Sequence, residues 1–177
     1  MRTLIVFRHA KAAREPGLPD HQRPLTDRGR RNARAMGEWL AAEGLLPDHA
    51  LISDAKRTRQ TFQQSREKFP ERLRVVSDPE LYHASEDVLL AAIHHVPDSA
   101  NCVLVCGHNP GLHDFTTGMV GAGEREALDR FRAGMPTAAV AVLGLDLARW
   151  RDAYWRSAKL LRFATPASIT GELGDSD

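Results

Sequence analysis

Short apolar runs recur along the chain and are separated by longer amphipathic stretches. The clearest runs are Leu4 to Phe7, Asn101 to Cys106 and Ala138 to Leu145, and none of them alternates regularly between apolar and polar residues. Unbroken runs of this length are typical of strands that are covered on both faces. The pattern therefore predicts a buried central sheet whose strands are mostly parallel.

Helical periodicity fills the intervals between these runs. The strongest example begins after Thr26, a residue type favoured at helix N-caps, and stops at Gly44. Its inward positions follow the i, i+3, i+4, i+7 spacing of one helix face, and they are Ala33, Met36, Gly37 and Leu40. Further helices are predicted over 55–68, 86–96 and 110–119.

The predicted elements alternate between strand and helix in the way that layered α/β folds do. The strands fall at 3–7, 49–52, 73–76, 102–106, 138–145 and 158–163, and the helix before the second strand covers 26–43. We expect a three-layer α/β/α sandwich around a mostly parallel sheet, formed as a single domain by residues 1–165. Residues 121–136 are expected to form a loop or short helix, and residues 166–177 a flexible C-terminal tail.

Composition and charge narrow the classes of function. The 177 residues are 42% hydrophobic and 27% charged, as in one ordinary globular domain. Lys and Arg total 24 against 23 for Asp and Glu, so the net charge is only +1. This balance argues against a main role in binding nucleic acid or an anionic membrane. Any chemistry with anions must therefore be local.

The two cysteines and the N-terminal run bear on the compartment. Cys102 and Cys106 lie four residues apart in one predicted strand, about 13 Å from each other, whereas disulfides need Cα atoms within about 7 Å. We expect both to be buried apolar groups in a reducing cytoplasm. The first apolar run is too short for a signal peptide, and no run approaches the roughly 18 residues of a membrane span.

Polar residues follow the apolar runs at the strand ends where ligands of open α/β sheets bind. The first predicted strand leads into Arg8 and His9, and the second leads to Arg57. The strand at 102–106 leads to His108 and Asn109. Because these strand ends meet at one edge of a parallel sheet, we expect the five residues to surround one crevice.

Two arginines and two histidines suit a phosphoryl group. Guanidinium forks bind phosphate oxygens bidentately, and a helix beginning at Pro110 would direct backbone N–H groups at the same anion. His9 is the candidate nucleophile, because no Cys, Ser or carboxylate is placed to attack. Neighbouring arginines would lower its pKa, and His108 would donate to the equatorial oxygens. Nothing in the sequence resembles a Walker loop or a metal cage, so side chains alone must neutralise the charge of the anion.

Several motifs follow one another in a fixed order from residue 3 to about Trp150. They are Arg8-His9-Ala10-Lys11, Arg23-Pro24-Leu25-Thr26 with Gly29, Ser53 to Thr61 around Arg57, Leu81-Tyr82, and Gly107 to Gly111. In this order and spacing they resemble the histidine phosphatase (phosphoglycerate mutase-like) superfamily. More narrowly, they resemble its short phosphohistidine phosphatase branch, the SixA group.

The resemblance implies a phosphoglycerate mutase-like fold and a two-step reaction. His9 would take the phosphoryl group as a covalent phosphohistidine, and water would then release inorganic phosphate. Arg8, Arg57 and His108 would form the phosphate pocket, with Asn109 among the substrate-binding residues and no metal or cofactor. Larger members carry insertions that cap the site, and this chain is too short for one. An open crevice would admit a bulky substrate such as a phosphorylated protein.

Two positions depart from the family pattern. Ala10 stands where the family usually has Gly, and its carbonyl can still orient the imidazole of His9. The acid that protonates an alcohol leaving group has no clear equivalent, although Glu80 and His83 lie near its place. A missing acid favours phosphoramidate substrates such as phosphohistidine, whose N–P bond breaks more readily. The alternatives are a phosphatase of small phosphomonoesters and a phospho-ligand binding module without turnover.

The other histidines are expected to be ordinary groups. His21, His49, His94 and His95 are expected on the surface, and His113 close enough to the crevice to contact the residues that line it.

Overall fold

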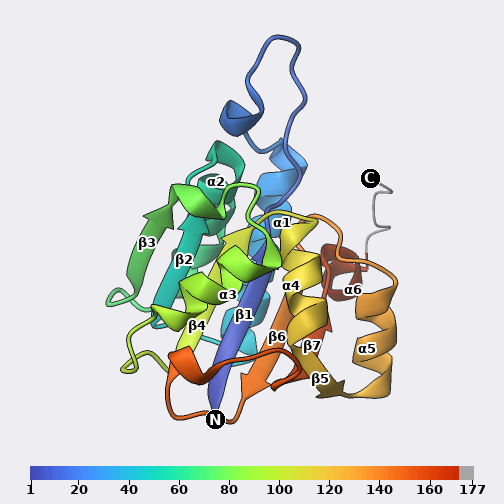
Figure 1. Ribbon diagram of the computed structural model, residues 1–177. Helices are drawn as coiled ribbons and strands as arrows, with labels where there is room; N and C mark the ends of the chain where they lie inside the picture. The colour runs from blue at the N-terminus through green and yellow to red at the C-terminus, as the bar shows by residue number, and fades with distance from the viewer. Residues whose placement is uncertain (172–177) are drawn as a thin grey trace.

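The computed structural model describes residues 1–171, and a seven-stranded sheet of order β3-β2-β4-β1-β6-β7-β5 lies at its centre (Figure 1). The strands are β1 (Arg2–Arg8), β2 (His49–Ser53), β3 (Arg74–Asp78), β4 (Cys102–Gly107), β5 (Val120–Gly123), β6 (Val140–Leu145) and β7 (Ala158–Ala164). The α-helices are α1 (Asp27–Ala42), α2 (Lys56–Ser65), α3 (Glu86–His94), α4 (Gly111–Met119), α5 (Arg125–Arg132) and α6 (Pro166–Thr170). Short 3₁₀ helices are η1 (Asp20–Gln22), η2 (Arg66–Lys68), η3 (Pro79–Leu81) and η4 (Trp150–Asp152).

The sheet is mostly parallel, as predicted. β6 pairs antiparallel with both β1 and β7, while the other pairings are parallel. Arg8 at the end of β1 is paired with Gly107 at the end of β4, and the backbone N–H of His9 donates to the Gly107 carbonyl at 3.0 Å. Since β2 also runs parallel to β4, the residues that follow β1, β2 and β4 leave the sheet at the same edge.

Helices cover both faces of the sheet, which confirms the three-layer prediction. Leu4 and Val6 of β1 pack with side chains of α3, α4 and α5, whereas Ile5 and Phe7 pack with α1 and α2. Figure 1 shows α3 and α4 in front of the sheet and α1 and α2 behind it. Burial of each such side chain contributes about 1.5–3 kcal/mol to the free energy of unfolding. The strand ends are therefore held in place by a well-packed core.

The first helix follows its sequence signals closely. The Thr26 hydroxyl accepts a hydrogen bond from the backbone N–H of Gly29 at 3.0 Å, and Gly44 has a left-handed φ of 71° just past the helix. All four predicted inward positions are buried. Gly37 lies directly against α2, because a Cβ atom there would approach the Ser65 carbonyl oxygen to 2.1 Å.

Several boundaries differ from the prediction. The segment 121–136 contains the helix α5, in agreement with the short-helix alternative, and also the end of β5, which was not predicted. The sequence did not predict β5, because Val-Gly-Ala-Gly has little strand preference. This strand depends on its pairing with β7. Residues Pro166–Thr170 form α6 rather than a flexible tail, with a capping box between Thr165 and Ser168. The remainder of the expected tail, 172–177, lies outside the described residues.

Among residues 1–171, the expectation of two buried cysteines is met by Cys106 and only in part by Cys102. Cys106 is fully buried and Cys102 half-buried, both are free, and burial raises the pKa of Cys102 to about 12. In the same residues, no helix is both long enough and apolar enough to cross a membrane.

The close contact at Gly37 yields a stability prediction. Gly37→Ala should lower the free energy of unfolding by about 1–3 kcal/mol, because the added methyl group forces α1 away from the backbone of α2. This loss should outweigh the gain of roughly 1 kcal/mol in helix propensity. Urea denaturation measures the change, with Glu38→Ala on the exposed side of α1 as the control. An equal or higher unfolding free energy for Gly37→Ala would contradict the packing described here.

Candidate active site

The structure brings the predicted arginines and histidines together at the edge where β1, β2 and β4 end. The Nε atom of Arg57, in the first turn of α2, lies 3.3 Å from Nε2 of His9. The ring centroids of His9 and His108 are 5.2 Å apart. Arg57 and His108 are almost completely buried, with 3% and 5% of their surface exposed. Residues from three distant segments thus share one small volume.

His9 is held as a neutral imidazole with a defined tautomer. Its Nδ1 atom lies 2.8 Å from the Ala10 carbonyl oxygen, and because that oxygen only accepts, Nδ1 carries the proton. The lone pair therefore resides on Nε2, where it accepts from Arg57. Burial, chiefly, together with the charges of Arg57 and Arg8, lowers the pKa of His9 to about 3. Burial, which the sequence analysis did not consider, is thus the largest cause.

His108 is neutral for the same main reason and has a polar atom without a partner. Burial, followed by the nearby His9 and Arg57, lowers its pKa to about 2. Its Nε2 lies 2.8 Å from the Ser53 hydroxyl oxygen, which already accepts from the Ala55 N–H at 3.3 Å. The Ser53 hydroxyl proton is therefore free to donate to Nε2. His108 then carries its own proton on Nδ1, which is buried without a hydrogen-bond partner.

Arg57 is anchored by a carboxylate that the sequence analysis missed. Its Nη1 donates to the Asp20 backbone carbonyl at 2.7 Å, and its Nη2 donates to the Asp20 carboxylate at 3.0 Å. The same carboxylate accepts from the Tyr82 hydroxyl at 2.5 Å and from Arg23 at 2.9 Å. Chiefly because of the Tyr82 hydrogen bond, the pKa of Asp20 lies well below its usual value. Asp20 is consequently ionised at neutral pH.

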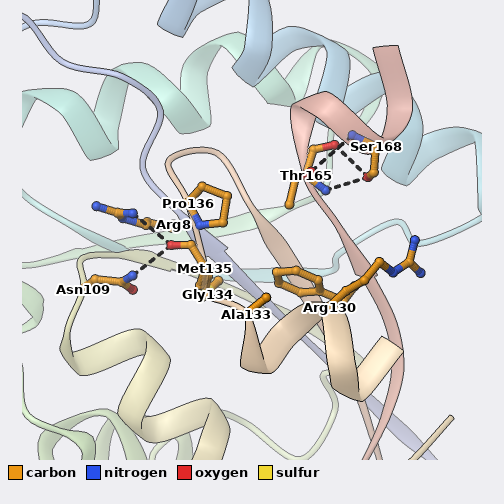
Figure 2. Close-up of a pocket in the computed structure, with 10 residues that line it drawn as sticks. Arg8, Asn109, Arg130, Ala133, Gly134, Met135, Pro136, Thr165 and Ser168 are labelled. Atoms are coloured by element: carbon orange, nitrogen blue, oxygen red, sulfur yellow. Dashed lines mark hydrogen bonds between the residues drawn. The ribbon is translucent and has the colours of Figure 1, made fainter. Parts of the chain in front are cut away.

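One backbone carbonyl orients both Arg8 and Asn109. Nη1 of Arg8 and Nδ2 of Asn109 each donate to the Met135 carbonyl oxygen at 2.9 Å, as Figure 2 shows. The peptide bond between Asn109 and Pro110 is cis, and Pro110 is the N-cap of α4 rather than its first residue. The N–H of Leu112 is already bonded to the His108 carbonyl. The expected set of free N–H groups at this helix is therefore smaller than predicted.

Only one of the two candidate acids reaches the site. His83 lies 3.6 Å from the Asp20 carboxylate, measured from Nε2, and its ring centroid is 5.7 Å from that of His108. Glu80 is exposed and lines a different groove, together with His49 and His95. The 3₁₀ turn η3 leaves the side chain of Glu80 exposed in that groove, two residues before Tyr82, so its role as an acid stays a prediction without support from this geometry.

Further residues near the site carried little sequence signal. His21 is not a simple surface group, since its Nε2 lies 2.8 Å from the Asp54 carboxylate and its ring packs edge-on against Tyr82. His49 is also not on the surface, with 4% exposed, but it lies in the separate groove that Glu80 lines. The signal that could have found Asp20 is its position three residues before Arg23, in a polar segment without helical or strand periodicity.

The geometry suits a dianionic, tetrahedral ligand. Guanidinium groups supply fixed positive charge, one neutral imidazole offers a lone pair, and the other offers an unpaired N–H. Within residues 1–171, no group of three or more His, Cys, Asp or Glu side chains is arranged to hold a metal ion.

Comparison with known proteins agrees with this geometry. The model of the histidine phosphatase superfamily (branch 1) matches residues 4–87. An uncharacterized protein of Mycobacterium tuberculosis is 33% identical over 162 residues, which cover 90% of this chain and 99% of that protein. A structure from Nakamurella multipartitia, provisionally named phosphohistidine phosphatase SixA, is 32% identical with a TM-score of 0.79. It is matched over 93% of this chain and 96% of that chain.

A second structure provisionally named SixA, from Agrobacterium tumefaciens, is 29% identical with a TM-score of 0.77, over 93% of this chain and 99% of that chain. The likeness extends well beyond the part that the family model matches. The chain therefore belongs to the histidine phosphatase superfamily, a family of phosphatase hydrolases, and is similar to its SixA members.

Proposed function

We propose that this protein is a metal-independent phosphatase that removes the phosphoryl group from phosphohistidine on a protein. The observation that carries the proposal is the state of His9, a neutral imidazole whose Nε2 lone pair faces Arg57 beside His108. Similarity to proteins provisionally named phosphohistidine phosphatases supports the choice of substrate.

In the first step, Nε2 of His9 attacks phosphorus. A bond forms between Nε2 and phosphorus, and the bond from phosphorus to the leaving nitrogen of the substrate breaks. The leaving nitrogen keeps the bonding electron pair, and the substrate ring departs as a neutral imidazole because its other ring nitrogen carries a proton. Arg57 must first release the Nε2 lone pair, so its Nε–H moves from His9 to a phosphate oxygen as substrate binds. Arg8 and the Nδ1–H of His108 would donate to the other oxygens, whose charge changes in the transition state.

In the second step, water attacks the phosphohistidine on His9. The bond between Nε2 and phosphorus breaks, inorganic phosphate leaves, and the imidazole regains its lone pair. The same guanidinium groups stabilise this second transition state, because it distributes charge over the same three oxygens. No other nucleophile is required, and the free enzyme is restored with the Nδ1 proton still donated to Ala10.

The groups around Asp20 favour a nitrogen leaving group over an alkoxide. Asp20 is ionised and its carboxylate already accepts from Arg57, Arg23 and Tyr82, so it has no proton to donate. Glu80 lies elsewhere, which leaves the exposed His83 as the remaining candidate for an acid. An alcohol ester needs such a proton donor, whereas the N–P bond of phosphohistidine breaks more readily. The site therefore suits phosphoramidates better than small phosphomonoesters.

Replacement of the nucleophile tests the two-step reaction. His9→Ala should reduce turnover of phosphohistidine by more than about a thousandfold, because the covalent intermediate cannot form. With a labelled phosphodonor and a rapid quench, the wild type should give an adduct that is stable to alkali and labile to acid. His95→Ala, an exposed substitution in the separate groove that Glu80 and His49 line, is the control. An adduct that survives in His9→Ala, or undiminished turnover, would remove His9 from its proposed role.

Replacement of Ser53 tests which ring nitrogen of His108 carries the proton. Without the Ser53 hydroxyl, Nε2 of His108 can take the ring proton, and Nδ1 then presents a lone pair where a donor is needed. Loss of one such hydrogen bond corresponds to a fall in kcat of about tenfold for Ser53→Ala, with a smaller change in KM. Ser77→Ala, an exposed position on β3, should leave both constants unchanged. Equal kinetics for the two variants would show that His108 does not depend on Ser53.

The protonation state of His9 is directly measurable. Since its pKa is lowered to about 3, the ring should remain neutral throughout pH 5–8 and gain a proton only as the pH falls towards 3. An unperturbed histidine would titrate near pH 6.5. Ring resonances assigned to His9 by comparison with His9→Ala should therefore show no titration in that range in the free protein. A midpoint between pH 5 and 7 would disprove the neutral, buried state.

A further inference from the structure

A pocket of about 570 Å³ opens beside the phosphate site, and the reaction described above does not use it. It lies between α5, the loop at 133–136 and the beginning of α6, as Figure 2 shows. Arg8 and Asn109 line it, but His9, Arg57 and His108 do not. The pocket is thus lateral to His9 and adjoins the phosphate site through Arg8 and Asn109.

The polar groups of this pocket are mostly occupied by one another. The Met135 carbonyl accepts from Arg8 and Asn109, and the hydroxyls of Thr165 and Ser168 complete the capping box of α6. What remains for a ligand is the apolar surface of a few side chains. These are Ala133, Met135, Pro136 and Phe163. An apolar group fits such a lining, because burying it costs no hydrogen bond.

Charge at the rim adds a second requirement. Arg130 of α5 lines the pocket at its outer side, and its ion pair with the exposed Glu126 is long, at 3.9 Å. The residues that line the pocket include two arginines, Arg8 and Arg130, and no carboxylate. A pocket of about 420 Å³ on the other side of Asn109 has the opposite character, since Glu86 and Asp114 line it. An acidic group is therefore attracted to the first pocket and repelled by the second.

We infer that the pocket lined by Phe163 and Arg130 is a subsite for the sequence that flanks the phosphorylated residue of a protein substrate. It takes an apolar side chain close to that residue, and an acidic side chain just beyond it pairs with Arg130. This inference rests on the proposed function and adds a sequence preference to it. A neighbouring side chain of the same polypeptide is the group that can reach a lateral pocket while the phosphoryl group stays on Arg8.

Phosphohistidine peptides test the subsite. The reference peptide carries Leu and Glu after the phosphohistidine, a second carries them before it, and two variants replace Glu by Lys or Leu by Ser. The wild type should hydrolyse one of the two Leu-Glu peptides with a kcat/KM at least fivefold higher than that of either variant. This peptide is the reference or the one with Leu and Glu before the phosphohistidine. Free phosphohistidine, which has no flanking residues, serves as the substrate that cannot reach the pocket.

Matched charge reversals identify the residue responsible. Arg130→Glu should lower kcat/KM for the preferred peptide by about tenfold and leave the Lys peptide equal or better. Arg132→Glu makes the same change of charge two residues away on α5, outside the lining of this pocket, and should change each rate by less than twofold. Ala133→Trp, at an exposed lining position, should abolish the preference for Leu over Ser. Free phosphohistidine should react within twofold of the wild type in all three variants.

The outcomes separate this inference from the proposed function. Equal effects of Arg130→Glu and Arg132→Glu, or an equal loss on free phosphohistidine and peptide, would overturn the subsite. Hydrolysis of all peptides at one rate would also overturn it, while leaving phosphohistidine as the substrate. Hydrolysis of small phosphate esters alone, with no phosphohistidine compound turned over by the wild type, would overturn both.

Discussion

The buried guanidinium of Arg57 is the interaction on which the site depends. A cation with 3% exposure is costly in a protein interior unless an opposite charge and hydrogen bonds compensate it. Asp20 supplies both, through its carboxylate and its backbone carbonyl, while the Nε–H of Arg57 faces His9. The irregular segment that carries Asp20 is thereby tied to α2 and to Tyr82. One ionic contact thus joins three parts of the chain around His9.

In this site, the permanent positive charge and the reactive groups belong to different residues. Arg8 and Arg57 supply the fixed positive charge of guanidinium groups, which attracts phosphate. The imidazoles of His9 and His108 stay neutral, because burial disfavours their charged forms more strongly than any nearby group favours them. A histidine that remained protonated could not attack phosphorus. Burial of the rings is therefore as necessary to the proposed reaction as the arginines themselves.

Asn109 lies between two pockets of opposite charge, so the surroundings of the phosphate site are asymmetric. Arg130 lines the larger pocket, and Glu86 and Asp114 line the smaller one. The Met135 carbonyl, which bonds to Arg8 and Asn109, couples the larger pocket to the phosphate site through the backbone. A substrate longer than a phosphoryl group therefore meets different chemistry on its two sides.

The sequence by itself determined the elements whose signals are local or periodic. The apolar runs predicted the parallel strands, and Thr26 and Gly44 marked the ends of α1. The common edge at which parallel strands end predicted that Arg57 and His108 lie beside His9. The burial and polarity of these residues follow from neighbours close in the chain or from the repeat of a helix or strand. Such features can therefore be predicted from the sequence alone.

Only the tertiary structure decided the features that depend on distant partners. Asp20 belongs to the site because Arg57 and Tyr82 reach it across long stretches of chain, and Glu80 does not because a 3₁₀ turn directs it outward. β5 is a strand because β7 offers it an edge. The tautomer of His108 likewise depends on Ser53, which lies 55 positions earlier. Contacts of this kind have no sequence period, since their geometry arises only when the packed layers bring separate loops together.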